Sequence, residues 1–118
     1  MPRRAVIISL VVLALLGVGA YAASLAGQFV WDDTLLIGGN KHITALRHIP
    51  AIFREDLFHM SDLPTGYYRP VQVLSYMADY LLWGKLPFGY HLTGIILQIM
   101  NAWLVFWLSF LVLGERWR

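Results

Sequence analysis

The chain has 118 residues, of which 58% are hydrophobic and only 14% are charged. Soluble domains carry about 45–50% apolar and about 25% charged residues, so this composition argues against a soluble domain. It also excludes a disordered chain, because disorder requires few apolar residues and a high net charge. The net charge is +2 and the basic residues form no run, so no nucleic-acid partner is expected. The composition indicates a membrane protein.

Two uncharged stretches predict two transmembrane helices. The first covers residues 5–26 and the second covers residues 91–114, where His91 is taken as neutral. At about 1.5 Å per residue, a helix of either length crosses the roughly 30 Å hydrocarbon core of a bilayer. An alternative for residues 5–26 is a cleaved signal peptide, although the apolar part of such peptides runs only about 7–15 residues. The predicted fold is an all-α membrane protein with two transmembrane helices flanking a loop over residues 27–89.

The flanking charges predict the orientation of both helices. Arg3 and Arg4 lie in the tail 1–4, and two further arginines lie in the tail 115–118. Basic residues close to a span are retained in the cytoplasm. We therefore expect two cytoplasmic tails and an extracytoplasmic loop, in the plasma membrane (the inner membrane of a bacterium).

The first part of the loop shows helical periodicity. Its apolar residues recur at helical spacing at Leu46, Ile49, Phe53 and Leu57. Pro50 cannot donate a backbone hydrogen bond inside a helix. The pattern therefore predicts two short pieces that meet at Ile49-Pro50.

A second amphipathic segment covers residues 70–83. Pro70 suits the first helical turn and Gly84 follows the last apolar residue. The polar stripe of this segment consists of Gln72, Ser75, Tyr76 and Asp79. The segment is too short to span a bilayer, so we expect it to lie in the membrane interface, in contact with lipid, or against other helices.

The second span carries polar residues on one face. His91, Gln98 and Asn101 share this face, together with Gly94, which would allow a close helix approach. The aromatic residues Trp103, Phe106, Trp107 and Phe110 are expected to face lipid. Polar side chains in a span normally turn towards other helices or a wet cavity, so the stripe predicts further helices or a partner subunit. The alternative is that each polar residue is tolerated singly.

An acidic pair, Asp32 and Asp33, follows the first span directly. Close to each other and to the low dielectric of a membrane, one of them could hold a proton and serve as a general base. The alternative is that one caps a short helix while the other is solvated. Two carboxylates without a third ligand do not specify a metal site, and there is no cysteine to add one. No cofactor is predicted, and a divalent cation stays an open alternative.

Two further sites could bind phosphate. Arg69, preceded by Tyr68, stands at the start of the predicted helix 70–83, where its planar guanidinium and the helix N-terminus both favour an anion. The alternative is an arginine that snorkels beside interfacial tyrosines. His91 could donate to a phosphate or bond a backbone carbonyl.

These features recur in order along residues 27–104. They are Phe29-Val30-Trp31-Asp32-Asp33, Asn40, Ile43, Ile52-Phe53, Tyr68-Arg69-Pro70, Tyr76, Asp79-Tyr80, Trp83-Gly84, Pro87, Gly89-Tyr90-His91 and Asn101-Ala102. In this order they resemble the N-terminal region of GT-C type membrane glycosyltransferases. The resemblance is strongest to the protein O-mannosyltransferases with transmembrane and tetratricopeptide-repeat regions, and to their bacterial relatives.

The resemblance implies an integral membrane enzyme that transfers a sugar from a polyprenyl-phosphate carrier to an acceptor hydroxyl on the extracytoplasmic side. It implies that Asp32 or Asp33 is the catalytic base. It assigns Arg69 to the donor phosphate, with Tyr68 and His91 as further substrate-binding candidates.

The family has many more spans than the two predicted here. We therefore expect a partial GT-C fold, the N-terminal fragment of a larger enzyme, which is inactive without the missing helices. The competing hypothesis is a non-enzymatic two-span subunit or assembly factor that holds a partner.

Overall fold

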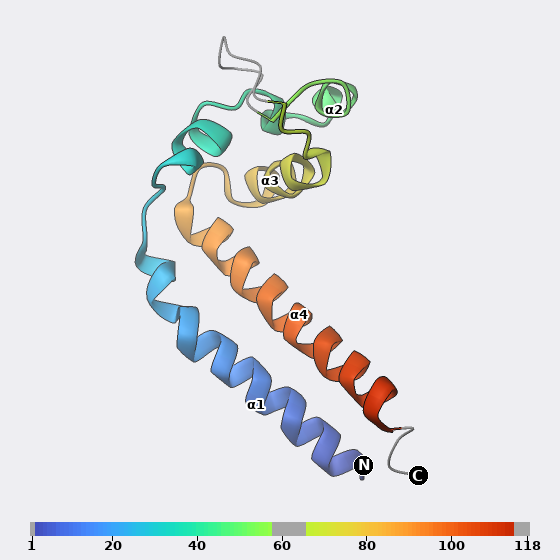
Figure 1. Cartoon of the computed structure of the whole chain (residues 1–118). Coiled ribbons are helices and arrows are strands. Elements are labelled where there is room, and N and C mark those ends of the chain that lie inside the picture. The colour runs from blue at the N-terminus through green and yellow to red at the C-terminus, as the bar shows by residue number, and fades with distance from the viewer. Residues whose placement is uncertain (1, 58–65, 115–118) are drawn as a thin grey trace. The chain divides into compact units, whose positions relative to one another are not determined.

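The computed structural model describes residues 2–57 and 66–114, which form helices and turns with no strand among them. The chain divides into two compact units. One, the hairpin unit, comprises residues 1–26 and 91–118, and the other, the loop unit, comprises residues 27–90 (Figure 1). The all-α prediction is confirmed for the described residues, whereas the tail predicted at 115–118 lies outside them.

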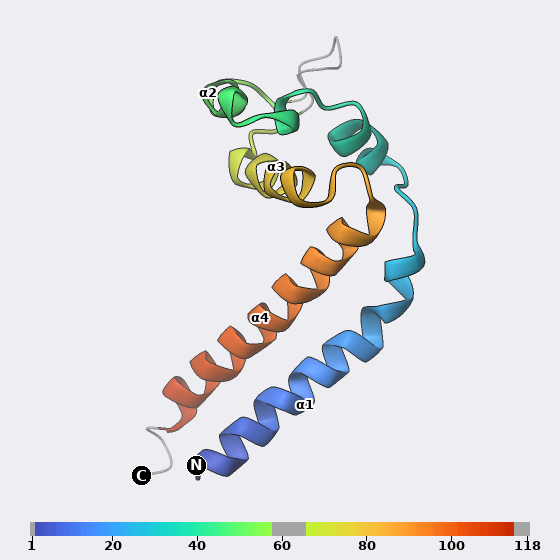
Figure 2. The same ribbon diagram turned by 180° about the vertical axis from the view of Figure 1, so that it is seen from behind.

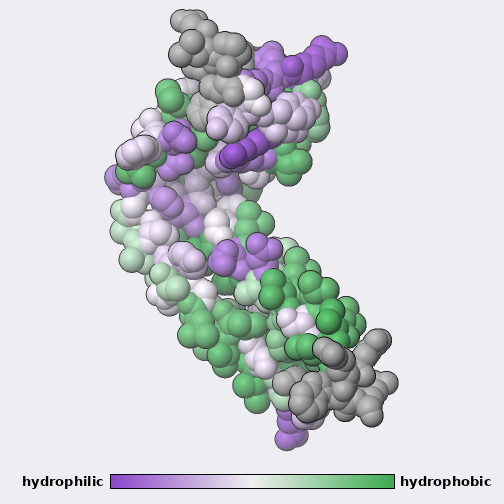
Figure 3. Space-filling model, in the orientation of Figure 1, coloured by the Kyte–Doolittle hydropathy of each residue, from purple (hydrophilic) through white to green (hydrophobic). Residues whose placement is uncertain are grey.

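Two helices are long and apolar enough to cross a membrane. Helix α1 covers Arg3–Tyr21 and continues as a 3₁₀ turn over Ala22–Ala26. Helix α4 covers Pro87–Gly114, so it begins at Pro87 rather than at His91 as predicted. The qualifying segments are Arg3–Ala26 and Pro87–Leu113, and hydrophobic side chains dominate the hairpin unit on the face in Figure 3. This arrangement is consistent with a membrane protein.

Helices α1 and α4 lie side by side and antiparallel within the hairpin unit (Figures 1 and 2). A Cβ atom added at Gly17 would approach Cγ1 of Ile99 to 2.9 Å, so the two helices are in close contact there. The indole Nε1 of Trp103 donates a hydrogen bond of 3.0 Å to the carbonyl of Leu10. The close approach therefore occurs at Gly17 and not at Gly94, where an added Cβ would point into open space.

The polar face of α4 is only partly as predicted. Gln98 and Asn101 line an open groove of about 520 Å³, which Leu13 of α1 and Ser109 of α4 also line. Phe106 lines the same groove and the indole of Trp103 bonds α1, whereas Trp107 and Phe110 are exposed; contact of these four residues with lipid stays a prediction.

Helix α3 of the loop unit covers Pro70–Trp83, with the bounds that the sequence predicts. Pro70 occupies the first turn, where its missing N–H costs no helical hydrogen bond. Gly84 has a φ of 62°, a left-handed conformation that ends the helix and that residues with a Cβ rarely adopt.

The segment before α3 breaks where Pro50 predicts a break. A 3₁₀ turn covers Leu46–His48, and helix α2 covers Ile49–Ile52. The predicted apolar face is only partly buried: Leu57 is buried and Ile49 is half-buried, whereas Leu46 and Phe53 are exposed. Ile52 is buried instead of Phe53, because the 3₁₀ turn shifts the residues that face the core.

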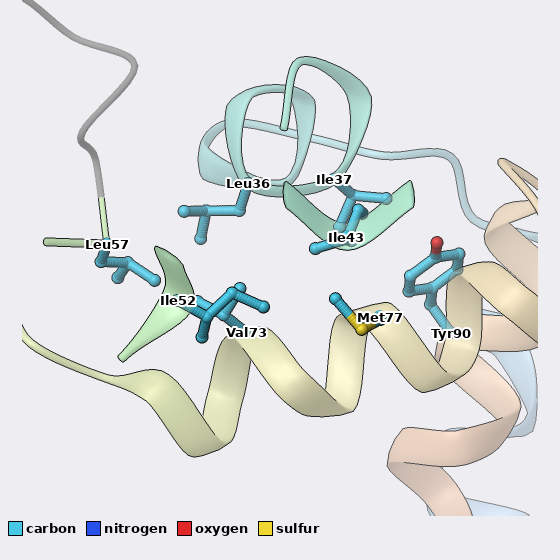
Figure 4. Close-up of a cluster of buried hydrophobic side chains, with 8 residues drawn as sticks. All are labelled: Leu36, Ile37, Ile43, Ile52, Leu57, Val73, Met77 and Tyr90. Carbon is cyan, nitrogen blue, oxygen red and sulfur yellow. The ribbon is translucent and has the colours of Figure 1, made fainter. Parts of the chain in front are cut away.

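The loop unit has its own hydrophobic core, which packs on one face of α3 (Figure 4). Val73 and Met77, four residues apart on α3, point towards side chains from the preceding turns and α2. The buried cluster consists of Leu36, Ile37, Ile43, Ile52, Leu57, Val73, Met77 and Tyr90. Ile43 is fully buried at its centre. This core makes residues 27–90 a folded unit, on which the functional candidates are held.

Candidate functional site

The acidic pair lies on a turn that backbone hydrogen bonds fix in place. The amide of Asp33 donates to the carbonyl of Val30 at 3.1 Å. The amide and the hydroxyl of Thr34 both donate to the carbonyl of Trp31, at 3.2 and 2.6 Å. Trp31 has a φ of 53°, which is rare for a bulky residue and marks a turn held by its surroundings. The turn leads into a single π-helical turn, Thr34–Gly38, whose buried side chains anchor it in the core.

The capping interpretation of the pair gains no support from the turn. Asp33 directly precedes the π-helical turn, yet its side chain makes no capping hydrogen bond. Asp33 is half-buried and Asp32 is exposed. Both carboxylates are therefore placed at a surface, where a substrate could reach them.

Both aspartates line one open cleft of about 470 Å³ within the loop unit. Arg69, which stands immediately before α3, lines the same cleft. The remaining residues of the cleft wall are Leu36, Leu57, Tyr67, Gln72 and Tyr76. Three of the five residues selected from the sequence are thus brought together by the fold, from segments far apart in the chain.

The side chain of Arg69 lies against Tyr67, immediately before the first residue of α3. Its guanidinium carbon lies 5.3 Å from the ring centroid of Tyr67, a cation–π distance. In the described part of the chain no ion pair joins Arg69 to Asp32 or Asp33. The positive charge is therefore not neutralised by the acidic pair and is available to an anion in the cleft.

A second cavity lies beside Arg69. It has a volume of about 20 Å³, room for one water molecule, and Asn40, His42, Glu55 and Asp56 line it with Arg69. His42 Nε2 lies 3.3 Å from a carboxylate oxygen of Glu55, and its backbone amide donates to Asn40 Oδ1 at 2.9 Å. These contacts join the segment before α2 to the segment after it, beside the cavity that Arg69 also lines. Asn40 belongs to the motifs that carry the family resemblance, whereas no sequence periodicity links His42, Glu55 and Asp56 to the site.

Tyr68 and His91 do not line the cleft. The hydroxyl of Tyr68 donates to the carbonyl of Phe53 at 3.0 Å, which ties the start of α3 to the end of α2. This contact gives Tyr68 a structural role. His91 belongs to the hairpin unit, is partly buried, and its Nε2 has no hydrogen-bond partner among the described residues.

The cleft also contains Tyr67, Gln72 and Tyr76, which the sequence does not predict as site residues. Gln72 and Tyr76 belong to the polar stripe of residues 70–83. Their spacing of four residues places Gln72 and Tyr76 on one face of α3, and their position shortly after Arg69 is the available signal. In the part of the chain that the structure describes, no three His, Asp or Glu side chains gather to hold a metal, so the open alternative of a divalent cation gains no support.

Similar proteins were found for most of the chain. It is 33% identical over 81% of its length to "Protein O-mannosyl-transferase Tmtc1" of Drosophila melanogaster, of which it covers 12%. It is 32% identical over 66% of its length to "Protein O-mannosyl-transferase TMTC4" of Homo sapiens, of which it covers 11%. It is 31% identical over 84% of its length to "Protein O-mannosyl-transferase F38B6.6" of Caenorhabditis elegans, of which it covers 15%.

The chain thus spans less than a sixth of the length of each of these relatives. No protein-family model matches it. No solved structure matches it either. The relatives support a glycosyltransferase-type function at the level of the family, and they confirm the resemblance of this chain to the protein O-mannosyltransferases that its motifs predict.

Proposed function

We propose that this chain supplies the acidic cleft of a membrane glycosyltransferase, which transfers a hexose from a polyprenyl-phosphate carrier to an acceptor hydroxyl on the extracytoplasmic side. The observation that carries the proposal is the presence of Asp32, Asp33 and Arg69 in one cleft. Such a cleft contains the two opposite charges that glycosyl transfer from a phosphate requires.

The chemistry assigns a separate role to each charge. One aspartate accepts the proton of the acceptor hydroxyl as the acceptor oxygen forms its bond to the anomeric carbon. The bond between that carbon and the phosphate oxygen breaks, and its electron pair leaves with the polyprenyl phosphate. Arg69 stabilises the charge of this leaving group, because a guanidinium matches phosphate oxygens with two parallel hydrogen bonds.

The helices that flank the loop unit in sequence support a lipid-linked donor. Both ends of the loop unit continue into helices that are long and apolar enough to cross a bilayer. A substrate with a polyprenyl tail is confined to the same membrane, so its phosphate stays close to the surface from which the loop unit emerges. The basic tails favour the extracytoplasmic side for this unit.

For the test, the complete reading frame that encodes this sequence is expressed, and membranes that contain the protein are prepared. Transfer of radiolabelled mannose from polyprenyl-phosphate mannose is measured for Asp32→Asn, Asp33→Asn and Arg69→Met. Loss of a general base lowers the rate by about 10²–10⁴-fold, so one aspartate variant should fall within that range. Arg54→Met removes an exposed arginine that does not line the cleft, and should leave transfer unchanged. Wild-type rates in both aspartate variants would refute the proposed role of the pair.

A second candidate function is to hold a partner helix, and the groove on α4 favours it. Gln98 and Asn101 are exposed in that groove, and amide side chains are costly in lipid unless another helix satisfies them. A photoreactive residue at position 101 should then crosslink to one defined partner in native membranes, while one at the outward-facing position 104 should not. Crosslinking to lipid alone at both positions would contradict this function.

A further inference from the structure

Two side chains of the cleft wall form a pair that the proposed reaction leaves unused. Gln72 and Tyr76 lie one turn apart on α3, and Gln72 Nε2 donates a hydrogen bond of 2.7 Å to the hydroxyl oxygen of Tyr76. Both residues are half-buried, and both line the cleft that holds the acidic pair. The hydrogen bond fixes the two polar groups relative to each other before any ligand binds.

The pair still offers at least one donor and one acceptor to a ligand. A tyrosine hydroxyl that accepts a hydrogen bond keeps its own proton for donation, and a glutamine that donates through its nitrogen keeps its carbonyl oxygen as an acceptor. Among the described residues, neither the Tyr76 proton nor Gln72 Oε1 has a recorded partner. An adjacent donor and acceptor match two neighbouring hydroxyl groups, each of which can both donate and accept.

The pair also lies at a suitable place relative to Arg69. Arg69 directly precedes α3, and Gln72 and Tyr76 lie on one face of its first two turns, about 6 Å apart along the helix axis. A hexose attached to a phosphate at Arg69 would extend along α3 towards them. An acceptor serine or threonine carries a single hydroxyl, whereas a hexose carries neighbouring hydroxyls.

We propose that Gln72 and Tyr76 form the sugar-recognising subsite of the cleft and bind neighbouring hydroxyl groups of the donor hexose. The proposal rests on the proposed glycosyltransferase function, because that function puts a hexose phosphate into the cleft. Gln72 and Tyr76 are binding residues and take no proton in the reaction.

The experiment separates the sugar from the phosphate. The full-length protein in lipid nanodiscs is titrated calorimetrically with two soluble probes, mannosyl citronellyl phosphate and citronellyl phosphate without the sugar. Tyr76→Phe and Gln72→Leu each remove one polar group from the pair. We expect each variant to lower the affinity for the sugar-bearing probe by about three- to tenfold. Binding of the sugar-free probe should not change. Tyr80→Phe removes a hydroxyl from the same helix at a position outside the cleft lining, and should affect neither probe.

The other outcomes overturn distinct claims. If the wild-type protein binds neither probe, the proposed function itself fails. Suppose that the wild-type protein binds both probes. If each variant then weakens the binding of both probes equally, or changes the binding of neither probe, the subsite fails while the proposed function stands. If donor binding is unchanged but the KM for an acceptor peptide rises, the pair recognises the acceptor and the assignment to the donor hexose is wrong. Equal melting temperatures of Tyr76→Phe and Tyr80→Phe show that the comparison is made between folded proteins.

Discussion

Replacing Ile43 by alanine should destabilise the loop unit more than any change at its surface. Ile43 is fully buried among Leu36, Met77 and the other core residues, and it lies on a 3₁₀ turn, His42–Thr44, that packs against α3. Truncating a buried isoleucine to alanine costs about 2–5 kcal/mol, from lost transfer free energy and the cavity that remains. At roughly 0.05–0.15 kcal/mol per residue, a unit the size of residues 27–90 has about 3–10 kcal/mol of total stability, so the change removes a large share of it.

Amide hydrogen exchange of α3 measures this loss directly. If these amides exchange through opening of the loop unit, each 1.4 kcal/mol lost accelerates exchange tenfold. Ile43→Ala should therefore accelerate exchange in the peptide covering residues 70–83 by roughly 30- to 4,000-fold. Ile43→Val, which costs about 0.5–1.5 kcal/mol, should give roughly a 2- to 12-fold acceleration.

Leu46→Ala provides the matched control, because Leu46 is an aliphatic residue of the next turn that is 62% exposed. In Leu46→Ala, amide exchange of the peptide covering residues 70–83 should stay within about twofold of the wild type, as expected for a surface substitution. The same acceleration in Leu46→Ala and Ile43→Ala, or none in Ile43→Ala, would refute the assignment of this cluster as the core that holds α3.

Three further changes test the backbone. Gly89→Ala should lower the stability of the loop unit by about 1–3 kcal/mol, because a Cβ at this position overlaps the ring of Trp83; thermal unfolding measures the shift. Gly17→Leu should lower the melting temperature of the hairpin unit, whereas Gly19→Leu should not, because only Gly17 lies against α4; equal effects would contradict this packing. Trp31→Gly should be more stable than Trp31→Ala by about 1 kcal/mol in denaturant unfolding, since glycine adopts the positive φ without strain. An equal stability of the two Trp31 variants would mean that the turn relaxes when the indole is removed.

Local chemistry and hydrophobic periodicity determined much of this fold from the sequence. Helix α3 begins at Pro70 and ends before Gly84 as predicted, because a proline at the first turn and a left-handed glycine act through their own backbones. The break at Pro50 follows from the same kind of local constraint. Two long uncharged stretches predict two apolar helices, since bilayer thickness sets the length required.

Part of the candidate site was also accessible from sequence. Asp32, Asp33 and Arg69 were selected for their charge and their position beside predicted helices, and the fold places all three on one cleft. The resemblance to a known family added the expected reaction, which the physics of two carboxylates alone does not specify. Tyr68 was selected for its place beside Arg69, but its hydroxyl is used in a structural contact with Phe53.

The tertiary structure alone decided which residues meet. Ile52 rather than Phe53 is buried after the 3₁₀ turn Leu46–His48, and the indole of Trp103 donates a hydrogen bond to the neighbouring helix α1. The cleft itself joins Asp33 to Gln72 and Tyr76, which are distant in the chain. Such contacts depend on how the turns before α3 fold back onto Val73 and Met77, and a periodic pattern identifies the face that is buried but not its partner. The sequence by itself therefore determined the helices and the charges, and the packing of the core determined the site that they form.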